Sequence, residues 1–278
     1  RAHPDCDFVV TTALDLPAYL DRIGWRGDAA PDLRTLASLV HAHMAAIPFE
    51  NIDVLLHRPI RLDLPSLQRK LVEDRRGGSC FEHATLFAAA LEAIGYAPVR
   101  HAARVILLKP RESAPRTHMF LTVPLAEGAF VADPGFGTLA PRMPVPLADG
   151  VQIHCCGDTH WMHRDAGRWT LRALRDGDTV DCWTSTMEQE FAVDFEMGNH
   201  FTSTYPGSPF VDRLMMRAIT PGGQVTVMNR DVTIRAGSDV RRLQLPDRAA
   251  LRALVGDHFG FDLPELETLC VPSIGEWT

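Results

Sequence analysis

The hydrophobic pattern of this chain changes period at Gly95, and that change limits the fold more than any other feature. Before Gly95 the apolar residues recur at the three-to-four-residue spacing of helices. This spacing predicts helices over Leu16–Ile23, Pro31–Ile47, Pro65–Asp74 and Cys80–Ile94. Ser79 is the expected N-cap of the last of these helices, Glu82 follows three residues later as in a capping box, and Gly95 is the expected stop.

Beyond Gly95, short segments rich in β-branched and apolar residues alternate with turn residues, which predicts strands. The expected strands are Val99–Leu108, Met119–Pro124, Phe130–Asp133, a segment around Trp161, Trp169–Ala173, Thr179–Thr184, Arg213–Ile219, Gln224–Met228 and Val232–Arg235. Further helices are expected at Glu188–Asn199 and Asp247–His258. Helices followed by strands and then by a mixed tail indicate an α+β fold, not an alternation of β and α units.

Composition argues against several classes of protein. The formal net charge of −7 lacks the basic excess typical of nucleic-acid binders. The chain has no run of about 18 apolar residues that could span a bilayer, and Arg1–Asp7 has no apolar core of the signal-peptide kind. We therefore expect a cytoplasmic protein, monomeric or homodimeric, without membrane or nucleic-acid partners. At 278 residues the chain needs no disulfides, so we interpret as reduced thiols Cys6, Cys80, Cys155, Cys156, Cys182 and Cys270.

The sharpest chemical motif runs from Arg75 to Glu82, with the sequence Arg-Arg-Gly-Gly-Ser-Cys-Phe-Glu. A cysteine that begins a helix faces unpaired N–H groups and the positive end of the helix dipole, which favour the nucleophilic thiolate. Gly77 and Gly78 would let the backbone approach a bound acyl group and leave N–H groups free for an oxyanion hole. Taken alone, the motif fits a buried structural Cys80 equally well.

Two further patches add a base and a carboxylate. His118 heads the apolar strand Thr117–Leu121, and Asp133 ends a strand before a glycine-rich turn. Each is weak alone, because a core histidine and a turn-capping aspartate are common. Together with Cys80 they supply nucleophile, base and orienting group in the order Cys, His, Asp, which is the papain-type arrangement in general form.

These three patches resemble the signature of the arylamine N-acetyltransferase family, which reads Arg-Gly-Gly-x-Cys-x-Glu, then Thr-His, then Asp-x-Gly-Phe-Gly. Similar stretches extend the resemblance over nearly the whole chain, at Tyr19–Gly24, Ile47–Ile52, Ala103–Val105 and Asn199–Phe210. The resemblance implies a helical bundle over residues 1–95, a β-barrel over 96–190 and an α/β lid over 191–278. The first two would be related to the cores of cysteine proteases.

The same resemblance implies the reaction. Acetyl-CoA would acetylate Cys80, and the acetyl group would then pass to the nitrogen of an arylamine, arylhydrazine or N-hydroxyarylamine. His118 would act as general base and acid, and Asp133 would orient it. Thr117 and His118 would contact the substrate. Coenzyme A would touch Phe201, Gly207 and Ser208.

The sequence departs from the family pattern at two places. Pro134 stands where the family commonly has Val. Because Pro134 follows Asp133, it should leave the side chain of Asp133 free. Ala114 and Pro115 stand near the family's phosphate contacts and are poor ligands for phosphate. Three alternatives stay open on the same scaffold, namely an amide synthase that closes macrolactams, a Cys-His-Asp hydrolase and a binding protein without activity.

Other conspicuous residues have a simpler interpretation. The spacing of His154, Cys155, Cys156, His160 and His163 matches no zinc pattern, so no metal is expected. The pairs Arg75-Arg76 and Arg241-Arg242 are interpreted as solvated surface. The tryptophans of the strands are interpreted as core residues, and they are Trp161, Trp169 and Trp183.

Overall fold

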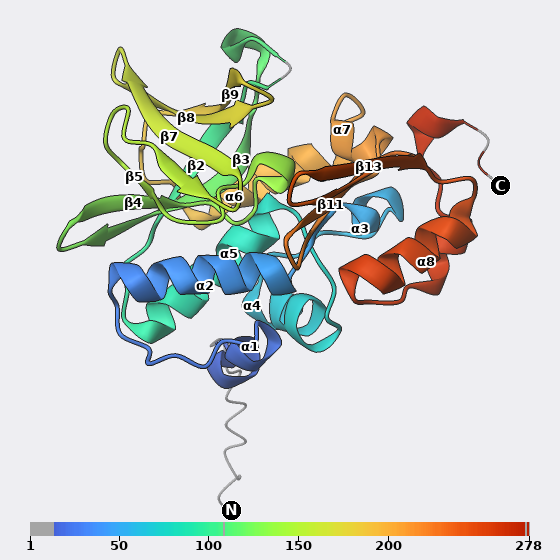
Figure 1. Cartoon of the computed structure of the whole chain (residues 1–278), viewed down its shortest axis with the longest axis horizontal. Coiled ribbons are helices and arrows are strands. Elements are labelled where there is room, and N and C mark those ends of the chain that lie inside the picture. The colour runs from blue at the N-terminus through green and yellow to red at the C-terminus, as the bar shows by residue number, and fades with distance from the viewer. Residues whose placement is uncertain (1–13, 108, 276, 278) are drawn as a thin grey trace, which may run out of the picture.

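The computed structural model describes residues 14–107, 109–275 and 277, so that Cys6, the segment Arg1–Asp7 and Leu108 lie outside the described residues. Its first part is helical (Figure 1). The helices are α1 (Leu16–Arg22), α2 (Leu33–Ala46), α3 (Ile52–Leu55), α4 (Leu64–Leu67), which continues as a π-helical turn over Gln68–Glu73, and α5 (Cys80–Ile94). Helix α2 begins two residues later than predicted, because the Asp32 carboxylate accepts the Thr35 N–H and caps it there.

The central part is an antiparallel eight-stranded sheet that curls into a nearly closed barrel. Its strands are β2 (Val99–Val105), β3 (Arg116–Leu125), β4 (Gly128–Ala132), β5 (Val145–Pro146), β6 (Ile153–Cys155), β7 (Asp158–Asp165), β8 (Arg168–Arg175) and β9 (Asp178–Ser185), in the order β5-β4-β3-β2-β9-β8-β7-β6. A bridge between Asp149 and Met162 brings the segment after β5 against β7. The barrel core contains Phe120, Leu171 and Trp183.

The last part consists of a second antiparallel sheet with helices around it (Figure 1). It contains α6 (Ala192–Thr204), α7 (Pro209–Asp212), β10 (Met215–Thr220), β11 (Gly223–Met228), β12 (Asp231–Ala236), β13 (Asp239–Gln244) and α8 (Arg248–Phe259). A short N-terminal strand, β1 (Phe49–Glu50), pairs with β10 and becomes the fifth strand of this sheet. Ile52 and Leu55 of α3 also pack into the core of this sheet. Single 3₁₀ turns lie at Arg111–Ser113, Gly137–Leu139, Pro264–Thr268 and Pro272–Ile274.

The α+β class is confirmed, whereas some predicted elements need correction. The helix expected over Glu188–Asn199 lies at Ala192–Thr204, because the Asp194 carboxylate accepts the Phe191 N–H and fixes the start there. Strand β13 was not predicted, since its exposed, charged sequence has no apolar alternation. The short elements β1, α3, β5, β6 and α7 were missed as well. The division at residues 95/96 and 190/191 stays a prediction.

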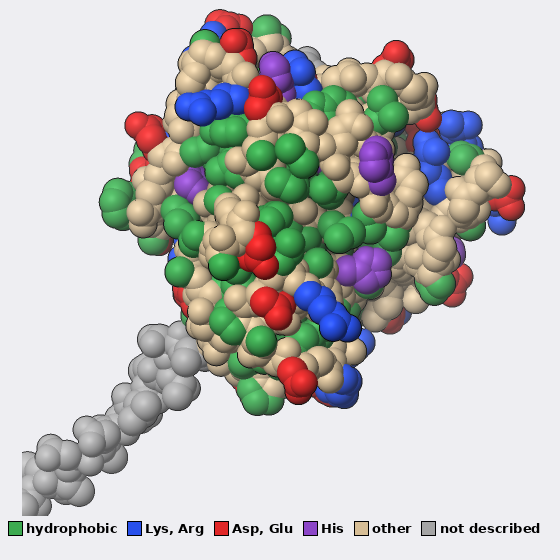
Figure 2. Space-filling model, turned by 60° about the vertical axis from the view of Figure 1, so that its left-hand side comes forward, with side chains coloured by type: hydrophobic (Ala, Val, Ile, Leu, Met, Phe, Trp, Pro, Cys, Tyr) green, Lys and Arg blue, Asp and Glu red, His purple; other side chains and the backbone are tan. Residues whose placement is uncertain are grey.

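No single sign of charge dominates the face of the molecule drawn in Figure 2. On the face drawn in Figure 2, Lys and Arg side chains occur in small separate groups among acidic and hydrophobic ones. Within the described ranges, no helix combines the length and the hydrophobicity needed to span a bilayer.

Candidate active site

Cys80 is the first residue of α5, and only 4% of its surface is exposed. Ser79 stands at the N-cap, and its N–H donates to the Glu82 carboxylate at 2.8 Å. This is one half of the predicted capping box. The Ser79 hydroxyl is buried and makes no hydrogen bond with the described residues, so the reciprocal half is not formed.

The glycines around Cys80 permit close backbone contacts. A Cβ on Gly77 would lie 2.2 Å from the Pro48 carbonyl oxygen, and one on Gly135 would lie 2.8 Å from the Cys80 Cα. The Gly78 N–H donates to Pro48 O at 3.2 Å. The expectation that both glycines leave N–H groups free for an oxyanion hole is therefore wrong for Gly78. Here the missing side chains allow two loops to pack against the start of α5.

His118 and Asp133 come together from neighbouring strands of the barrel. His118 lies in β3 and Asp133 directly follows β4. The His118 Nε2 is 2.9 Å from Asp133 Oδ2, and both side chains are buried. Because the carboxylate accepts, Nε2 carries the proton, which leaves Nδ1 as the nitrogen available to Cys80.

The electrostatics of His118 are set by these neighbours. Burial alone would lower its pKa, but the Asp133 carboxylate and the Cys80 side chain together raise the pKa of His118 to about 10. The imidazole is therefore cationic at neutral pH. Such a cation can balance a thiolate on Cys80.

Trp183 is part of this group, although its sequence context indicated only a core residue. Its indole N–H donates to Asp133 Oδ2 at 2.8 Å, the same oxygen that accepts from His118. Its ring stacks on Phe120 with centroids 4.1 Å apart. Trp183 therefore fixes one orientation of the Asp133 carboxylate. No local signal in the sequence distinguishes it from Trp161 or Trp169.

A buried ionic cluster holds the segment that precedes Cys80. Arg76 bonds Glu50 at 2.7 Å and Asp53 at 2.9 Å. Lys70 bonds Asp53 at 2.8 Å and Glu82 at 2.7 Å. The interpretation of Arg76 as solvated surface is thus wrong, because it is only 9% exposed and both of its terminal nitrogens are paired with carboxylates. Since Glu50 and Glu82 flank the loop from two elements, the cluster ties β1 and the π-helical turn to the start of α5.

A second buried chain of hydrogen bonds reaches the same loop. It runs from the Tyr19 hydroxyl to His43 Nδ1 at 2.8 Å, from His43 Nε2 to His83 Nδ1 at 2.9 Å, and from His83 Nε2 to Pro48 O at 3.1 Å. Because Pro48 O can only accept, each link has one direction, and both imidazoles are neutral. We call Tyr19, His43 and His83 the histidine relay. It ends on the carbonyl that also holds Gly78.

Thr117, predicted to contact substrate, lies in β3, whereas the residues predicted to contact coenzyme A lie in α6 and directly after it. Thr117 precedes His118 in β3, and its carbonyl oxygen is 3.7 Å from Cys80 Sγ. Phe201 stacks on Tyr205 with centroids 4.4 Å apart, while Gly207 is exposed. The Ser208 hydroxyl donates to Thr202 O at 2.6 Å and accepts from Phe210 N–H at 3.2 Å, so its hydrogen bonds cap α7.

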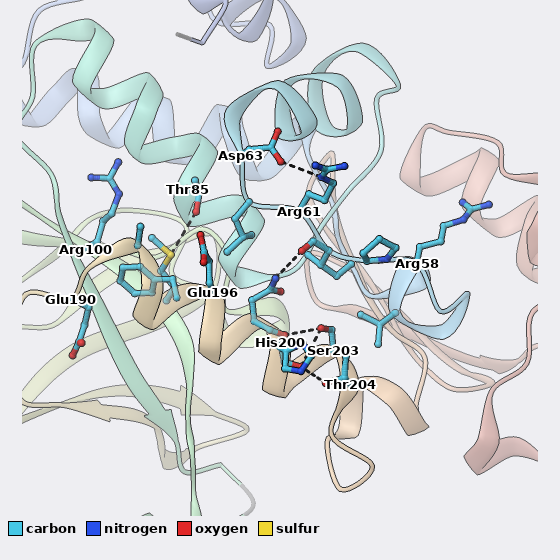
Figure 3. Close-up of a pocket in the computed structure, with 18 of the residues that line it drawn as sticks. Arg58, Arg61, Asp63, Thr85, Arg100, Glu190, Glu196, His200, Ser203 and Thr204 are labelled. Atoms are coloured by element: carbon cyan, nitrogen blue, oxygen red, sulfur yellow. Dashed lines mark hydrogen bonds and ion pairs between the residues drawn. The ribbon is translucent and has the colours of Figure 1, made fainter. Parts of the chain in front are cut away.

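A large cavity adjoins the apolar cluster around Cys80. Its volume is about 1160 Å³, and Cys80, His118 and Asp133 are not among the residues that line it. Leu62, Met119 and Phe195 line the cavity and also pack in one cluster with Cys80. In Figure 3, Arg100 and Glu190 lie at one end and Arg58 at the other. Cys80 therefore has this cavity on the α6 side, behind a layer of apolar side chains.

The histidines weighed as metal ligands point to other partners. His160 Nε2 donates to Leu139 O at 2.9 Å, and His163 Nδ1 lies 3.1 Å from Asp149 Oδ1. Among residues 14–107, 109–275 and 277, no three His, Cys, Asp or Glu side chains form a group that could hold a metal ion.

Comparisons with known proteins agree with this architecture. A family model described as N-acetyltransferase matches residues 32–268. The arylamine N-acetyltransferase of Mycolicibacterium smegmatis is 34% identical over 91% of this chain and 94% of that protein. The Escherichia coli (strain K12) enzyme of the same name is 35% identical over 89% of each chain. The Mycobacterium marinum arylamine N-acetyltransferase in complex with CoA superposes with a TM-score of 0.87 at 31% identity, over 92% of this chain and 100% of that chain.

The fold and these matches identify the chain as an N-acetyltransferase. More narrowly, it belongs to the arylamine N-acetyltransferase family, and it is an enzyme of that kind.

Proposed function

We propose that this enzyme transfers an acetyl group from acetyl-CoA, through a thioester on Cys80, to the nitrogen of arylamines, arylhydrazines or N-hydroxyarylamines. The observation that carries the proposal is the buried His118–Asp133 pair beside a cysteine at the start of a helix. Cys80 is the nucleophile, His118 the general base and acid, and Asp133 the orienting group. Relatives named arylamine N-acetyltransferase, one of them in complex with CoA, support the choice of donor and acceptor.

The first half-reaction starts from a Cys80 thiolate beside cationic His118, in which Nε2 donates to Asp133 and Nδ1 holds the proton of the thiol. The thiolate attacks the acetyl carbonyl carbon, a C–S bond forms at Cys80, and the C–S bond to coenzyme A breaks. The departing thiolate takes the proton from His118. One thioester replaces another, so this step needs no amine.

In the second half-reaction, the amine nitrogen attacks the acetyl group on Cys80. His118 accepts a proton from that nitrogen as the C–S bond breaks, and the Cys80 thiolate is restored beside the imidazolium. The Phe136 ring lies edge-on to the His118 ring, with the ring centroids 4.9 Å apart. Aromatic surface beside His118 suits a flat aryl acceptor.

Substrate contacts are proposed at Thr117 and His118, and contacts to coenzyme A at Phe201, Gly207 and Ser208. The Ser208 hydroxyl is already used twice within the protein, so its contribution would come from its backbone. Ala114 is buried and its carbonyl accepts from Arg104. This supports the expectation that Ala114 is a poor ligand for phosphate.

The direct test measures release of coenzyme A from acetyl-CoA with and without an arylamine. We expect release that depends on the amine and disappears in Cys80→Ser. Cys270→Ser is the matched control, because Cys270 is an exposed thiol outside the site. Equal release without amine would indicate the hydrolase. Failure of small arylamines together with turnover of a long activated acyl chain would indicate the amide synthase.

A further inference from the structure

Two adjacent thiols stand at the tip of the β6–β7 hairpin, in a part of the barrel that the proposed acetyl transfer does not use. Cys155 Sγ and Cys156 Sγ are 3.3 Å apart. Cys155 is half-buried and Cys156 is exposed. Two sulfurs at this separation can bind a single atom, and a reagent in solvent can reach them.

The hairpin turn holds Cys156 in an unusual backbone conformation. Cys155 pairs with Asp158, so that Cys156 and Gly157 form a two-residue turn. Their φ angles are 54° and 83°, both in the left-handed region. Asn-Gly is the preferred sequence for such a turn, and a side chain other than Asn, Asp or Gly costs about 1 kcal/mol there. This turn conformation places the Cys156 sulfur beside the Cys155 sulfur.

We propose that Cys155 and Cys156 form a dithiol site for trivalent arsenic carried by a monosubstituted organic arsenical, R–As=O. Two As–S bonds form and the two S–H bonds break. The arsenic–oxygen double bond also breaks, and its oxygen leaves as water with both thiol protons. Arsenic remains trivalent throughout, so no oxidant or reductant is needed.

The surroundings favour such an arsenical over a divalent metal ion. A structural zinc site needs four ligands, whereas His154 Nδ1 is bonded to Thr159 Oγ1 at 2.9 Å. The Asp158 carboxylate is paired with Arg142 at 3.2 Å. Among the described residues no group of three His, Cys, Asp or Glu side chains could hold a metal ion, whereas arsenic that already carries an organic group requires only the two thiols.

The protonation of the thiols points the same way. Burial and the contact with Cys156 raise the pKa of Cys155 to about 11, so this thiol keeps its proton at neutral pH. A divalent cation would have to expel that proton into water. The arsenical oxygen instead consumes it.

An aryl substituent on the arsenic would find apolar surface nearby. Cys156 lines a cavity of about 960 Å³ between the barrel and the second sheet, together with Arg142 and Leu174. Leu174 is a hydrophobic side chain that is 47% exposed. An aromatic arsenical therefore suits the site better than inorganic arsenite.

The test uses phenylarsine oxide on the full chain, followed by intact mass measurement. We expect one adduct, with the mass of a phenylarsenic group less two hydrogens. It should survive a large excess of glutathione, because a monothiol does not compete with a closed ring, and it should be removed by 2,3-dimercaptopropanol. Cys155→Ser and Cys156→Ser should each lose the glutathione-resistant adduct, whereas Cys80→Ser and Cys270→Ser should keep it.

Each other outcome overturns the proposal. A resistant adduct that persists in either hairpin variant, or that disappears in Cys80→Ser, would place arsenic on other thiols. Absence of a resistant adduct from the unaltered protein would mean that the two sulfurs do not act together. Circular dichroism confirms that the variants are folded, and acetyl transfer is not part of the readout, so the result is independent of the proposed function.

Discussion

At the scale of single residues, the proposed catalysis depends on the charge of Asp133. Its carboxylate opposes the effect of burial and raises the pKa of His118 to about 10. We expect Asp133→Asn to lower kcat roughly 10³–10⁴-fold, because an amide can favour the wrong imidazole tautomer. Steady-state kinetics measure this loss on variant protein with an unchanged circular dichroism spectrum. A rate near that of the unaltered enzyme would remove Asp133 from the mechanism.

The same substitution has a consequence for stability that depends on pH. The folded pKa of His118, about 10, lies above its unfolded value of about 6.5. Its contribution is therefore fully present below pH 6.5 and is lost as the pH rises through 10. The difference in the free energy of unfolding between the unaltered protein and Asp133→Asn should be largest near pH 6 and should shrink toward pH 10. A constant difference across this range would contradict the assigned shift.

Trp183 is expected to position Asp133 without touching substrate. Phenylalanine at this position keeps the stacking on Phe120 and loses the N–H donor. Trp183→Phe should lower kcat about tenfold, which corresponds to ~1.4 kcal/mol of activation free energy. The KM for acetyl-CoA should stay unchanged. Trp169→Phe is the matched control, since Trp169 packs against Arg164 on the barrel surface. Equal effects of the two substitutions on kcat would reduce Trp183 to a core residue.

At the scale of elements, the histidine relay makes the helical part sensitive to acid. Burial lowers the pKa of His83 to about 4, below the unfolded value of about 6.5. The unfolded chain therefore binds more protons than the folded one between these values, and stability is lost as the pH falls through that window. The neutral His83→Gln should lessen the slope of unfolding free energy against pH by about 1.4 kcal/mol per unit. Urea denaturation at pH 5, 6 and 7 measures this slope. An unchanged slope would mean that burial does not lower the pKa of His83.

The ionic cluster should be essential to the segment before Cys80. Removing Lys70 leaves the Asp53 and Glu82 carboxylates with an unbalanced buried charge, which costs roughly 3–5 kcal/mol. Lys70→Met should show this loss in urea denaturation. Arg69→Met, at the exposed neighbouring position, should change the free energy of unfolding by less than about 1 kcal/mol. Similar effects of the two substitutions would mean that the cluster does not hold the loop.

These elements also show what the sequence can predict. The Cys80, His118 and Asp133 patches stand out because each couples a reactive side chain to a local signal, namely a helix start, a strand or a glycine turn. The relay has no such signal, because His43 and His83 are 40 residues apart and each occupies an apolar face of its helix. Glu50 and Arg76 are likewise 26 residues apart and come together where Phe49 bridges Gly78. Contacts made by folding, and not by spacing, account for what was missed.

At the scale of the whole molecule, the first half-reaction must be complete without an acceptor. Helical part and barrel together supply Cys80, His118 and Asp133, so that acetyl-CoA alone should acetylate the enzyme. Initial rates at several acetyl-CoA concentrations, plotted against arylamine as double reciprocals, should then give parallel lines. Iodoacetamide should label Cys80 ahead of the other cysteines, and prior acetylation should protect Cys80 from this labelling.

The most direct measurement is a rapid-quench peptide map of the enzyme mixed with acetyl-CoA and no amine. The thioester mechanism predicts one acetyl group per chain, located on Cys80 and discharged when an arylamine is added. An absence of any acetyl adduct on Cys80, together with intersecting initial-rate lines, would mean that the acetyl group passes directly from donor to acceptor in a ternary complex, and the thioester mechanism would be wrong.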